Sequence, residues 1–314
     1  VVTNVSADHL EQNYINDLEK MSRVKGIIPE VVKPDGYAIL NADDSLVAKM
    51  ANQTKGKVIY FSLDYKLNPV IKEHLKSGGI AVIFEEGVFC VMKGKWQYPL
   101  VEAKDVPITF DGKARFNIAN VLAAIGATIA MGVKNENINA ALTTFFPSYS
   151  QTPGRLTMFD MGPYKALVDF AHNVAGYDAL AEFVKSLNPE NSIATICLPG
   201  DRRDEDFQNV AKTVAETFNQ VILFEGYLRG KKTGYISNTL QKYLISYGMD
   251  SNKIEIITDE HDAVQYALDL AQEGDLLVIS NYDIEGVHNR LIEHKKIMET
   301  KETKKHKPKV LEAV

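Results

Sequence analysis

LVDFAHNVAGYDAL (167–180) and LPGDRRDEDF (198–207), in the region that begins at Gln151 and ends near Asp206, decide the fold class of this chain. At each motif an apolar run of strand length, 165–170 or 193–198, ends in a polar turn, and a segment with helical periodicity follows. In an open α/β sheet, ligands bind at the carboxyl ends of the strands. The two motifs therefore predict an α/β domain whose ligand site is built from the residues of these two turns.

The same alternation of apolar strands and amphipathic helices continues on both sides of the two motifs. Strands are expected near 156–161, 165–170, 193–198, 220–225, 254–257 and 276–280, with helices near 176–187, 204–218, 234–247, 260–273 and 284–296. Such alternation indicates a mostly parallel sheet with helices on its faces. Residues 298–314 are rich in lysine and lack apolar periodicity, which predicts a flexible, solvated basic tail.

The chain before this region is expected to form a second α/β domain. Strands are predicted at 1–5, 37–43 and 57–63, a hairpin at 80–94 turning at Glu86-Gly87, and helices at 11–24, 44–53, 68–79, 116–133 and 137–146. The polar cluster PSYSQTPG (147–154) is the best candidate for a domain boundary. We therefore assign residues 1–148 to one domain and residues 152–297 to the other.

Composition excludes several classes of protein. The 314 residues carry a net charge of −6, which gives no general case for binding nucleic acid. The sequence contains no apolar run of membrane-spanning length and no signal-peptide pattern. The two cysteines, Cys90 and Cys197, stand in apolar runs and are expected to be buried thiols rather than a disulfide or metal pair. We expect a cytoplasmic protein without membrane or nucleic-acid partners.

Further motifs resemble one known superfamily. TNVSADHL (3–10), RVKGIIPEVV (23–32), YAILNADD (37–44) and ARFNIANVLAA (114–124), followed by the two opening motifs and LRG (228–230), are similar to the Mur ligases, and within them to the C-terminal half of the cyanophycin synthetases. The resemblance implies the C-terminal part of a Mur ligase central ATPase domain followed by a Rossmann-like C-terminal domain. It also implies ATP and Mg²⁺ as cofactors and a homo-oligomer.

The activity that the resemblance implies joins an amino group to a carboxylate with ATP. The carboxylate becomes an acyl phosphate, the amine attacks it, and phosphate leaves. Enzymes of this kind hold the triphosphate in line and stabilise the charge that develops. For this family the expected substrates are ATP, an amino acid, which we take to be arginine, and an aspartate-based polymer.

Two positions near the start of the chain are implied at the metal. The resemblance assigns His9 as a magnesium ligand, although magnesium prefers oxygen ligands. It assigns Lys25 a catalytic role as a carbamylated lysine, whose added carboxylate suits a position that faces a metal. The residues alone leave His9 as a histidine in a polar turn and Lys25 as a lysine on a helix surface.

Other residues are implied at the nucleotide. Asn117 and Asn120 share one face of a helix and are expected at the adenine, although Asn117 could instead cap that helix. Arg155 is expected to reach phosphate or ribose, and Asp169 the ribose hydroxyls. His172, as a catalytic residue, and Asn173 are expected to face the acyl phosphate, with helix capping as the alternative for Asn173.

The charged turn Asp201–Asp204 is expected to bind substrate. Acidic side chains at a helix N-terminus complement the helix dipole and could be purely structural. The positive charges of Arg202 and Arg203 oppose that dipole, so the dipole does not explain their presence. An anionic substrate is the natural partner for them. Asp201 and Asp204 could meet the guanidinium of an arginine substrate.

The sequence contains no phosphate-binding motif of the form G-x-x-x-x-G-K-(S/T). GYLRGKKT (226–233) does not qualify, because only three residues separate its glycines. We expect a chain cut within its ATPase domain that needs the missing upstream ATPase and ATP-grasp segments as partners and does not turn over ATP alone. Two alternatives remain open: another Mur-type ligase, acting on folate or a peptidoglycan precursor, and a non-catalytic module that binds a nucleotide or a partner chain.

Overall fold

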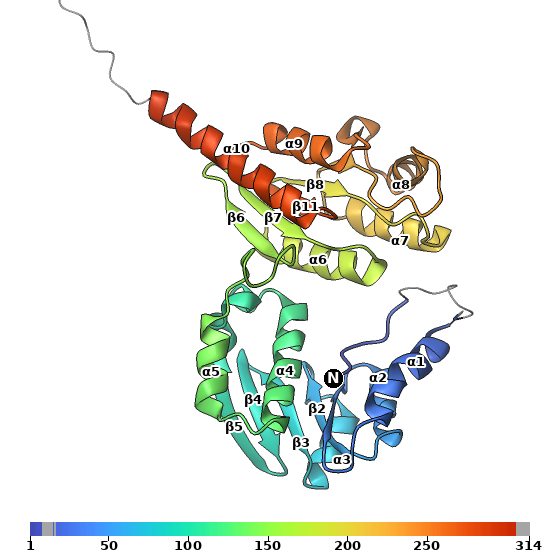
Figure 1. The fold of residues 1–314 in the computed structure, drawn as a ribbon, viewed down its shortest axis with the longest axis vertical. Helices are drawn as coiled ribbons and strands as arrows, with labels where there is room; N and C mark the ends of the chain where they lie inside the picture. Colours follow the sequence, from blue (N-terminus) through green and yellow to red (C-terminus); the bar gives the residue numbers. More distant parts are fainter. Residues whose placement is uncertain (8–14, 16, 306–314) are drawn as a thin grey trace, which may run out of the picture. The chain divides into compact units, whose positions relative to one another are not determined.

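The computed structural model describes residues 1–7, 15 and 17–305 and divides the chain into two compact units between Phe146 and Pro147 (Figure 1). The division falls at the start of the polar cluster 147–154. Each unit is an α/β structure with its own sheet and is described here separately. None of the helices in the described part of the chain has the length and apolarity of a membrane-spanning segment.

Unit 1 is built on a five-stranded sheet in the order β1-β2-β3-β4-β5. The strands are β1 (Tyr37–Asn41), β2 (Lys57–Ser62), β3 (Ile80–Glu85), β4 (Val88–Lys93) and β5 (Trp96–Glu102), and the helices are α1 (Leu18–Glu30), α2 (Ser45–Lys49), α3 (Pro69–Lys76), α4 (Arg115–Ala130) and α5 (Asn135–Thr144). β1, β2 and β3 are parallel, and β4 and β5 continue as antiparallel strands. The predicted hairpin at 80–94 is confirmed, because Glu86 and Gly87 both adopt the left-handed conformation that a tight hairpin turn requires.

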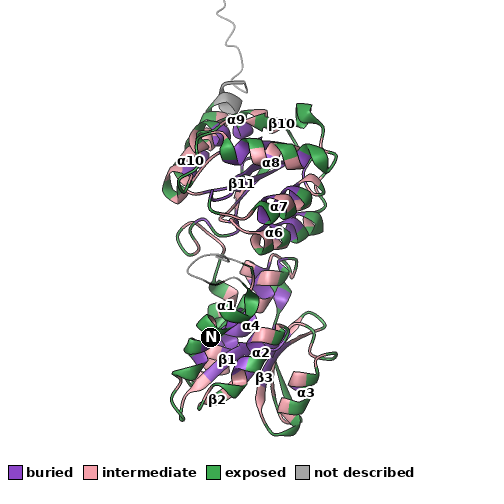
Figure 2. Ribbon diagram, turned by 90° about the vertical axis from the view of Figure 1, so that its right-hand side faces the viewer, coloured by how far each residue is buried: buried purple, intermediate pink, exposed green. Residues whose placement is uncertain are grey.

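The period-2 alternation of the strands produces two separate cores in unit 1. Ile39 and Ile59 belong to the buried cluster that contains Leu122 of α4. Leu40 belongs to the cluster on the other face, which contains Ile71 of α3. Figure 2 shows buried positions along the strands of unit 1 and on parts of the helices that cover them. The parallel part of the sheet is thus covered on both faces, as parallel sheets require.

Unit 2 contains a six-stranded sheet in the order β10-β9-β8-β11-β7-β6. Its strands are β6 (Thr157–Asp160), β7 (Lys165–Asp169), β8 (Ser192–Ile196), β9 (Gln220–Leu223), β10 (Ile254–Ile256) and β11 (Leu276–Ser280), and its helices are α6 (Val174–Leu187), α7 (Asp204–Ala215), α8 (Tyr235–Ser246), α9 (Glu260–Leu270) and α10 (Ile284–Lys305). Only the pairing of β6 with β7 is antiparallel. The predicted strands, helices and mostly parallel sheet of this unit are confirmed.

The strand order explains where the helices of unit 2 lie. The chain moves from β7 to β8, β9 and β10 in one direction and returns from β10 to β11 in the other. Because such crossovers are right-handed, α6, α7 and α8 must cover one face and α9 the opposite face. The contacts agree: α7 packs against both α6 and α8, whereas α9 packs against α10. All the parallel strands therefore present their carboxyl ends at one edge.

Three predictions about the ends of elements were wrong. Residues 1–5 do not form a strand in the described structure, because only Val2 makes an isolated bridge, to Leu40. The helix expected at 11–24 is described from Leu18 and runs to Glu30, with Pro29 in its last turn. α10 continues to Lys305, well into the predicted tail, because METKETKK consists mainly of residues with good helix propensity.

Candidate active site

Asp169 occupies the carboxyl end of β7, at the edge where the sequence predicted a ligand site. Its Oδ2 atom accepts a hydrogen bond of 2.9 Å from the backbone N–H of Leu156. Burial raises the pKa of this carboxyl group, and the Leu156 bond and the positive charge of Arg155 offset the shift only in part. The fold therefore holds an acceptor that is costly to bury, as is common at functional sites.

Phe170 contacts Arg155 through its ring and His172 through its backbone carbonyl, beside this carboxylate. The guanidinium carbon of Arg155 lies 4.8 Å from the centre of the ring, a cation–π distance. Nδ1 of His172 lies 3.0 Å from the carbonyl oxygen of Phe170. A proton on Nδ1 would be donated to that carbonyl, which leaves Nε2 as the basic nitrogen. The structure thus brings three of the predicted residues, Arg155, Asp169 and His172, to one place.

Asn173 begins helix α6. Its Oδ1 atom accepts a hydrogen bond of 2.8 Å from the backbone N–H of Gly176, so its side chain caps the helix. This is the structural alternative that the sequence offered for Asn173. The cap also holds the N-terminus of α6, whose dipole favours a negative group, next to His172.

Arg202 connects the turn after β8 to the turn after β7. Its side chain is only 6% exposed, and Nη1 lies 3.8 Å from Oδ1 of Asp201. Its Nε donates a hydrogen bond of 3.4 Å to the backbone carbonyl of His172. A guanidinium enclosed this far has its direction fixed by the fold, which is what the recognition of an anion requires.

Arg203 and Asp204 have strong partners within the protein. The guanidinium of Arg203 makes two bonds to Asp206, of 3.1 Å from Nε and 2.6 Å from Nη2, and the Arg203 N–H donates to the same carboxylate. Asp204 accepts hydrogen bonds from the hydroxyl of Tyr243, which lower the pKa of its carboxyl group. These contacts hold α7 at its N-terminus and against α8, so Arg203 and Asp204 contribute to structure whether or not they touch substrate.

The predicted adenine residues lie at the start of α4 in unit 1. Asn117 is buried and donates a hydrogen bond of 2.8 Å to the carbonyl of Ile108. It does not cap the helix, since Ala114 occupies the cap position. Its Oδ1 atom accepts a bond of 3.2 Å from Nδ2 of Asn120, which is exposed. Asn120 is thus the one of the two that a ligand can reach, and Asn117 fixes its orientation.

The predicted metal site is described only in part. Nζ of Lys25 donates a hydrogen bond of 3.3 Å to the carbonyl of Asn4, which places Lys25 beside the TNVSADHL motif. His9 lies outside the residues that the structure describes. Within residues 1–7, 15 and 17–305, no three His, Cys, Asp or Glu side chains gather as metal ligands.

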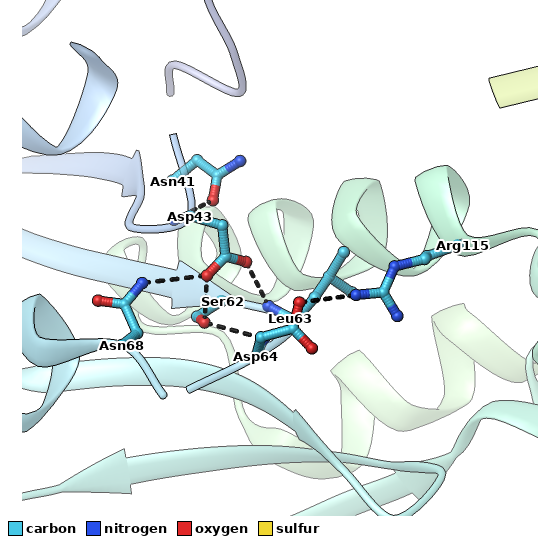
Figure 3. Close-up of polar contacts among 7 residues, drawn as sticks. All are labelled: Asn41, Asp43, Ser62, Leu63, Asp64, Asn68 and Arg115. Atoms are coloured by element: carbon cyan, nitrogen blue, oxygen red, sulfur yellow. Dashed lines mark hydrogen bonds and ion pairs between the residues drawn. The ribbon is translucent and has the colours of Figure 1, made fainter. Parts of the chain in front are cut away.

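A polar cluster in unit 1 was missed by the sequence reasoning (Figure 3). Asp43 accepts hydrogen bonds from Ser62 Oγ at 2.6 Å, Leu63 N at 2.6 Å and Asn68 Nδ2 at 3.1 Å, and nearby Asp64 pairs with Arg115 at 2.7 Å. These bonds tie the carboxyl ends of β1 and β2 together beside a hollow of about 660 Å³. The signal was available, because Asp43 ends the strand predicted at 37–43 and Asp64 follows the strand predicted at 57–63.

Asn281, in the turn SNYDIEG (280–286), was not predicted as a site residue either. It follows β11, is only 1% exposed, and neither polar atom of its side chain has a hydrogen-bond partner. Its backbone N–H donates to the carbonyl of Asp169. The Nδ2 atom would be 2.8 Å from a side chain at Gly154, a position with a φ of +67°, so glycine is needed there for two reasons.

Comparison with known proteins supplies the context for this arrangement. Residues 1–128 match the family model of the Mur ligase middle domain, and residues 154–280 match that of the Mur ligase glutamate ligase domain. A cyanophycin synthetase of Crocosphaera subtropica is 44% identical over 280 residues, covering 89% of this chain and 32% of that protein. The chain therefore spans about a third of the length of the cyanophycin synthetases that it matches.

More distant relatives and solved structures are also ligases or synthases of related fold. A UDP-N-acetylmuramoyl-L-alanyl-D-glutamate–2,6-diaminopimelate ligase of Bacteroides fragilis is 27% identical over 303 residues, covering 91% of this chain and 56% of that protein. The fold is similar to that of a bifunctional folylpolyglutamate synthase/dihydrofolate synthase of Yersinia pestis, with a TM-score of 0.62 at 15% identity, over 93% of this chain and 60% of that one. The chain belongs to the Mur ligase family, with middle-domain sequence followed by the glutamate ligase domain.

Proposed function

We propose that this chain supplies part of an ATP-dependent amide ligase of the cyanophycin synthetase type, which joins arginine to an aspartate polymer through an acyl phosphate. The observation that carries the proposal is the 44% identity to a cyanophycin synthetase across 89% of the chain. That level of identity is well above the 27% shared with a ligase of peptidoglycan precursors, which supports the polymer reading over the other Mur-type activities.

The residues at the carboxyl edge of unit 2 suit the chemistry of the proposed reaction. Asp169 would accept hydrogen bonds from ribose hydroxyls, and the planar guanidinium of Arg155 would contact the nucleotide. His172 and the N-terminus of α6 would face the acyl phosphate, where the helix dipole and the enclosed Arg202 stabilise negative charge. Asp201 is then left beside Arg202 as the candidate for contact with a cationic substrate group.

In unit 1, Asn117 and Asn120 would have different roles. Exposed Asn120 would contact adenine, whereas buried Asn117 is a positioning residue that holds the Asn120 amide. The proposal includes magnesium as the counter-ion of the nucleotide, with His9 and a carbamylated Lys25 as its expected ligands. The bond from Lys25 to Asn4 supports this, because it holds Lys25 beside the first residues of the motif that contains His9.

The test is arginine incorporation by the full natural protein. Purified protein, ATP, magnesium, an aspartate-polymer primer and arginine should release ADP, and release should stop when either the primer or arginine is omitted. Folate and muramoyl acceptors, each with its own amino acid, are run in parallel. ADP release with one of those acceptors and none with the polymer would refute the proposal.

A matched pair of variants connects the activity to the site. Asp169→Asn should weaken nucleotide binding by about tenfold, corresponding to about 1.4 kcal/mol, because a neutral amide is a weaker acceptor for ribose hydroxyls. Asp269→Asn makes the same chemical change at an exposed position on α9 and should leave nucleotide binding unchanged. Equal effects of the two variants would contradict the assignment of Asp169.

A further inference from the structure

A short segment after β9 carries three exposed cationic side chains near the carboxyl edge of unit 2. This segment, Tyr227–Lys232, is called the cationic loop below. It contains Arg229, Lys231 and Lys232, and all three are exposed. The sequence search set it aside because it fails as a phosphate-binding loop, and nothing in the proposed reaction uses it.

The cationic loop is held in place by its backbone. Gly226 N donates to Sγ of buried Cys197 at 3.1 Å, Lys231 N donates to the carbonyl of Leu228 at 2.9 Å, and Arg229 and Gly230 both adopt positive φ. On the far side, Glu225 anchors Gly234 through a bond of 2.7 Å. A loop fixed in this way presents its charges in a defined arrangement and loses little entropy when it binds a ligand.

The positive charges of the loop are not neutralised within the protein. Arg229 lies over the ring of Tyr227 at 5.0 Å and Lys231 over the ring of Tyr235 at 4.7 Å. Across the described part of the chain, none of the three cations pairs with a carboxylate. The carboxylate of Glu225, although close in sequence, accepts three backbone N–H groups at the start of α8 instead.

The loop places three such cations within four residues of a chain whose net charge is −6. By contrast, the guanidinium of Arg203 in the neighbouring turn pairs with Asp206. Cations that are fixed, exposed and left without carboxylates indicate an anionic partner from outside the chain.

The cationic loop adjoins the candidate active site. Gly200, in the turn after β8, donates a hydrogen bond of 2.9 Å to the carbonyl of Tyr227. A side chain at Gly200 would collide with the carbonyl of Leu228, so the two turns touch backbone to backbone. The exposed acids Asp201 and Asp204 therefore stand beside the exposed cations of the loop.

We propose that the cationic loop docks an acidic polypeptide, and, resting on the proposed function, that this polypeptide is the aspartate polymer that the ligase extends. Three cations within four residues can engage several carboxylates of one chain at once, which holds a polymer near the site through many weak contacts. Docking beside the turn Asp201–Arg202 keeps the growing polymer next to the groups that would act on its end.

The neighbouring groups favour a polypeptide over a nucleic acid. The exposed rings of Tyr227 in the loop and Tyr235 at the start of α8 each already have a cation over them, which leaves less of each face for stacking on a base. Asp201, Asp204 and Glu205 repel any polyanion, but the backbone N–H groups of a polypeptide can donate hydrogen bonds to their carboxylates, which a phosphate backbone cannot do.

The experiment measures polymer binding without ATP. Fluorescence anisotropy of labelled poly-L-aspartate is followed during titration with the full natural protein, at low and at physiological salt. The triple variant Arg229→Gln/Lys231→Gln/Lys232→Gln should weaken binding about tenfold, since each exposed ion pair contributes only a modest amount. Its affinity should also depend less on salt, because screening acts on fewer charge pairs.

The control triple variant is Lys185→Gln/Lys242→Gln/Lys253→Gln. These lysines are exposed on unit 2, and Lys242 lies over a tyrosine ring at 5.1 Å, much as Lys231 does. The control loses the same net charge and should bind the polymer as the parent does. The single variants Arg229→Gln and Lys232→Gln should each show part of the loss, so the result does not depend on one triple variant folding.

Three results would overturn the proposal. Equal weakening by both triple variants would assign binding to net charge alone. If the loop variants bound the polymer with unchanged affinity, the polymer-binding site would lie elsewhere, for instance at the lysines after residue 297. Equal or tighter binding of single-stranded DNA of matched charge would assign the surface to nucleic acid. The ligase proposal has a separate readout, because binding without arginine-dependent ADP release would refute the ligase alone.

Discussion

Replacing Glu225 with alanine tests how the end of β9 is held. The Glu225 carboxylate accepts four hydrogen bonds: from Gly234 N at 2.7 Å, Ile236 N at 3.0 Å, and Ser237 N and Oγ at 3.1 Å each. It thus acts as the N-terminal cap of α8, whose own cap position is a glycine without a side chain. Ser237 is completely buried, so water cannot easily replace the carboxylate there.

The expected loss follows from these contacts. Losing an N-terminal cap costs about 1 kcal/mol. Leaving a buried polar group without its partner costs about 1–3 kcal/mol. Because the four bonds share one carboxylate and are not additive, we expect Glu225→Ala to lower the free energy of unfolding by roughly 3 kcal/mol. Glu225→Gln retains one acceptor oxygen and should lose about 1 kcal/mol.

Urea unfolding, followed by far-ultraviolet circular dichroism, measures the change in the free energy of unfolding. Faster hydrogen exchange of the α8 backbone amides would show that the loss of stability is located at this helix. Glu182→Ala, at an exposed position on α6, is the control and should change the free energy of unfolding by less than about 0.5 kcal/mol. If Glu225→Ala behaved like that control, the carboxylate would not be the cap, and the rigidity of the cationic loop would need another source.

Two further predictions concern titrating groups in unit 2. Because burial raises the pKa of Asp169 above its ordinary 3.8, the native state binds this proton more tightly than the unfolded chain, and stability falls as pH rises from 3.8 through the raised pKa. Asp169→Asn should remove this fall and be at least as stable as the parent at about pH 7, as measured by urea midpoints; a large loss of stability there would contradict it. Burial raises the pKa of Cys197 to about 12, so iodoacetamide at about pH 8 should leave this thiol unmodified in the native protein and modify it in urea, as read by mass spectrometry; native modification would contradict the burial.

The regular elements could be predicted because local and global signals agree in this sequence. The strands of unit 2 are short apolar runs bounded by turns, and tertiary packing requires the same pattern. The failures came where one signal stood alone. Residues 1–5 have strand-like composition but make only one bridge, and the lysine-rich end has high helix propensity without the apolar stripe that was used to find helices.

The sequence could predict which edge of the sheet carries the candidate site, but not the side-chain contacts within the site. Strand ends identified Asp169 and the turn containing Arg202, because topology alone brings carboxyl ends together. The sequence could not show that Asp206 engages Arg203, nor that the unpartnered amide of Asn281 lies under Gly154. Such pairings depend on side-chain directions that are set by packing between segments far apart in the chain.

The position of β11 has a consequence for biosynthesis. This strand is the last of its sheet in the sequence, yet it lies between β7 and β8, and Ser280 is in register with Asp169. Until the ribosome has released Leu276–Ser280, the two neighbouring strands have no partner between them, and their unpaired edges invite association with other chains. Unit 2 therefore cannot complete its sheet until most of its length has been translated, and during that time the edges of β7 and β8 are the parts that a chaperone would have to protect.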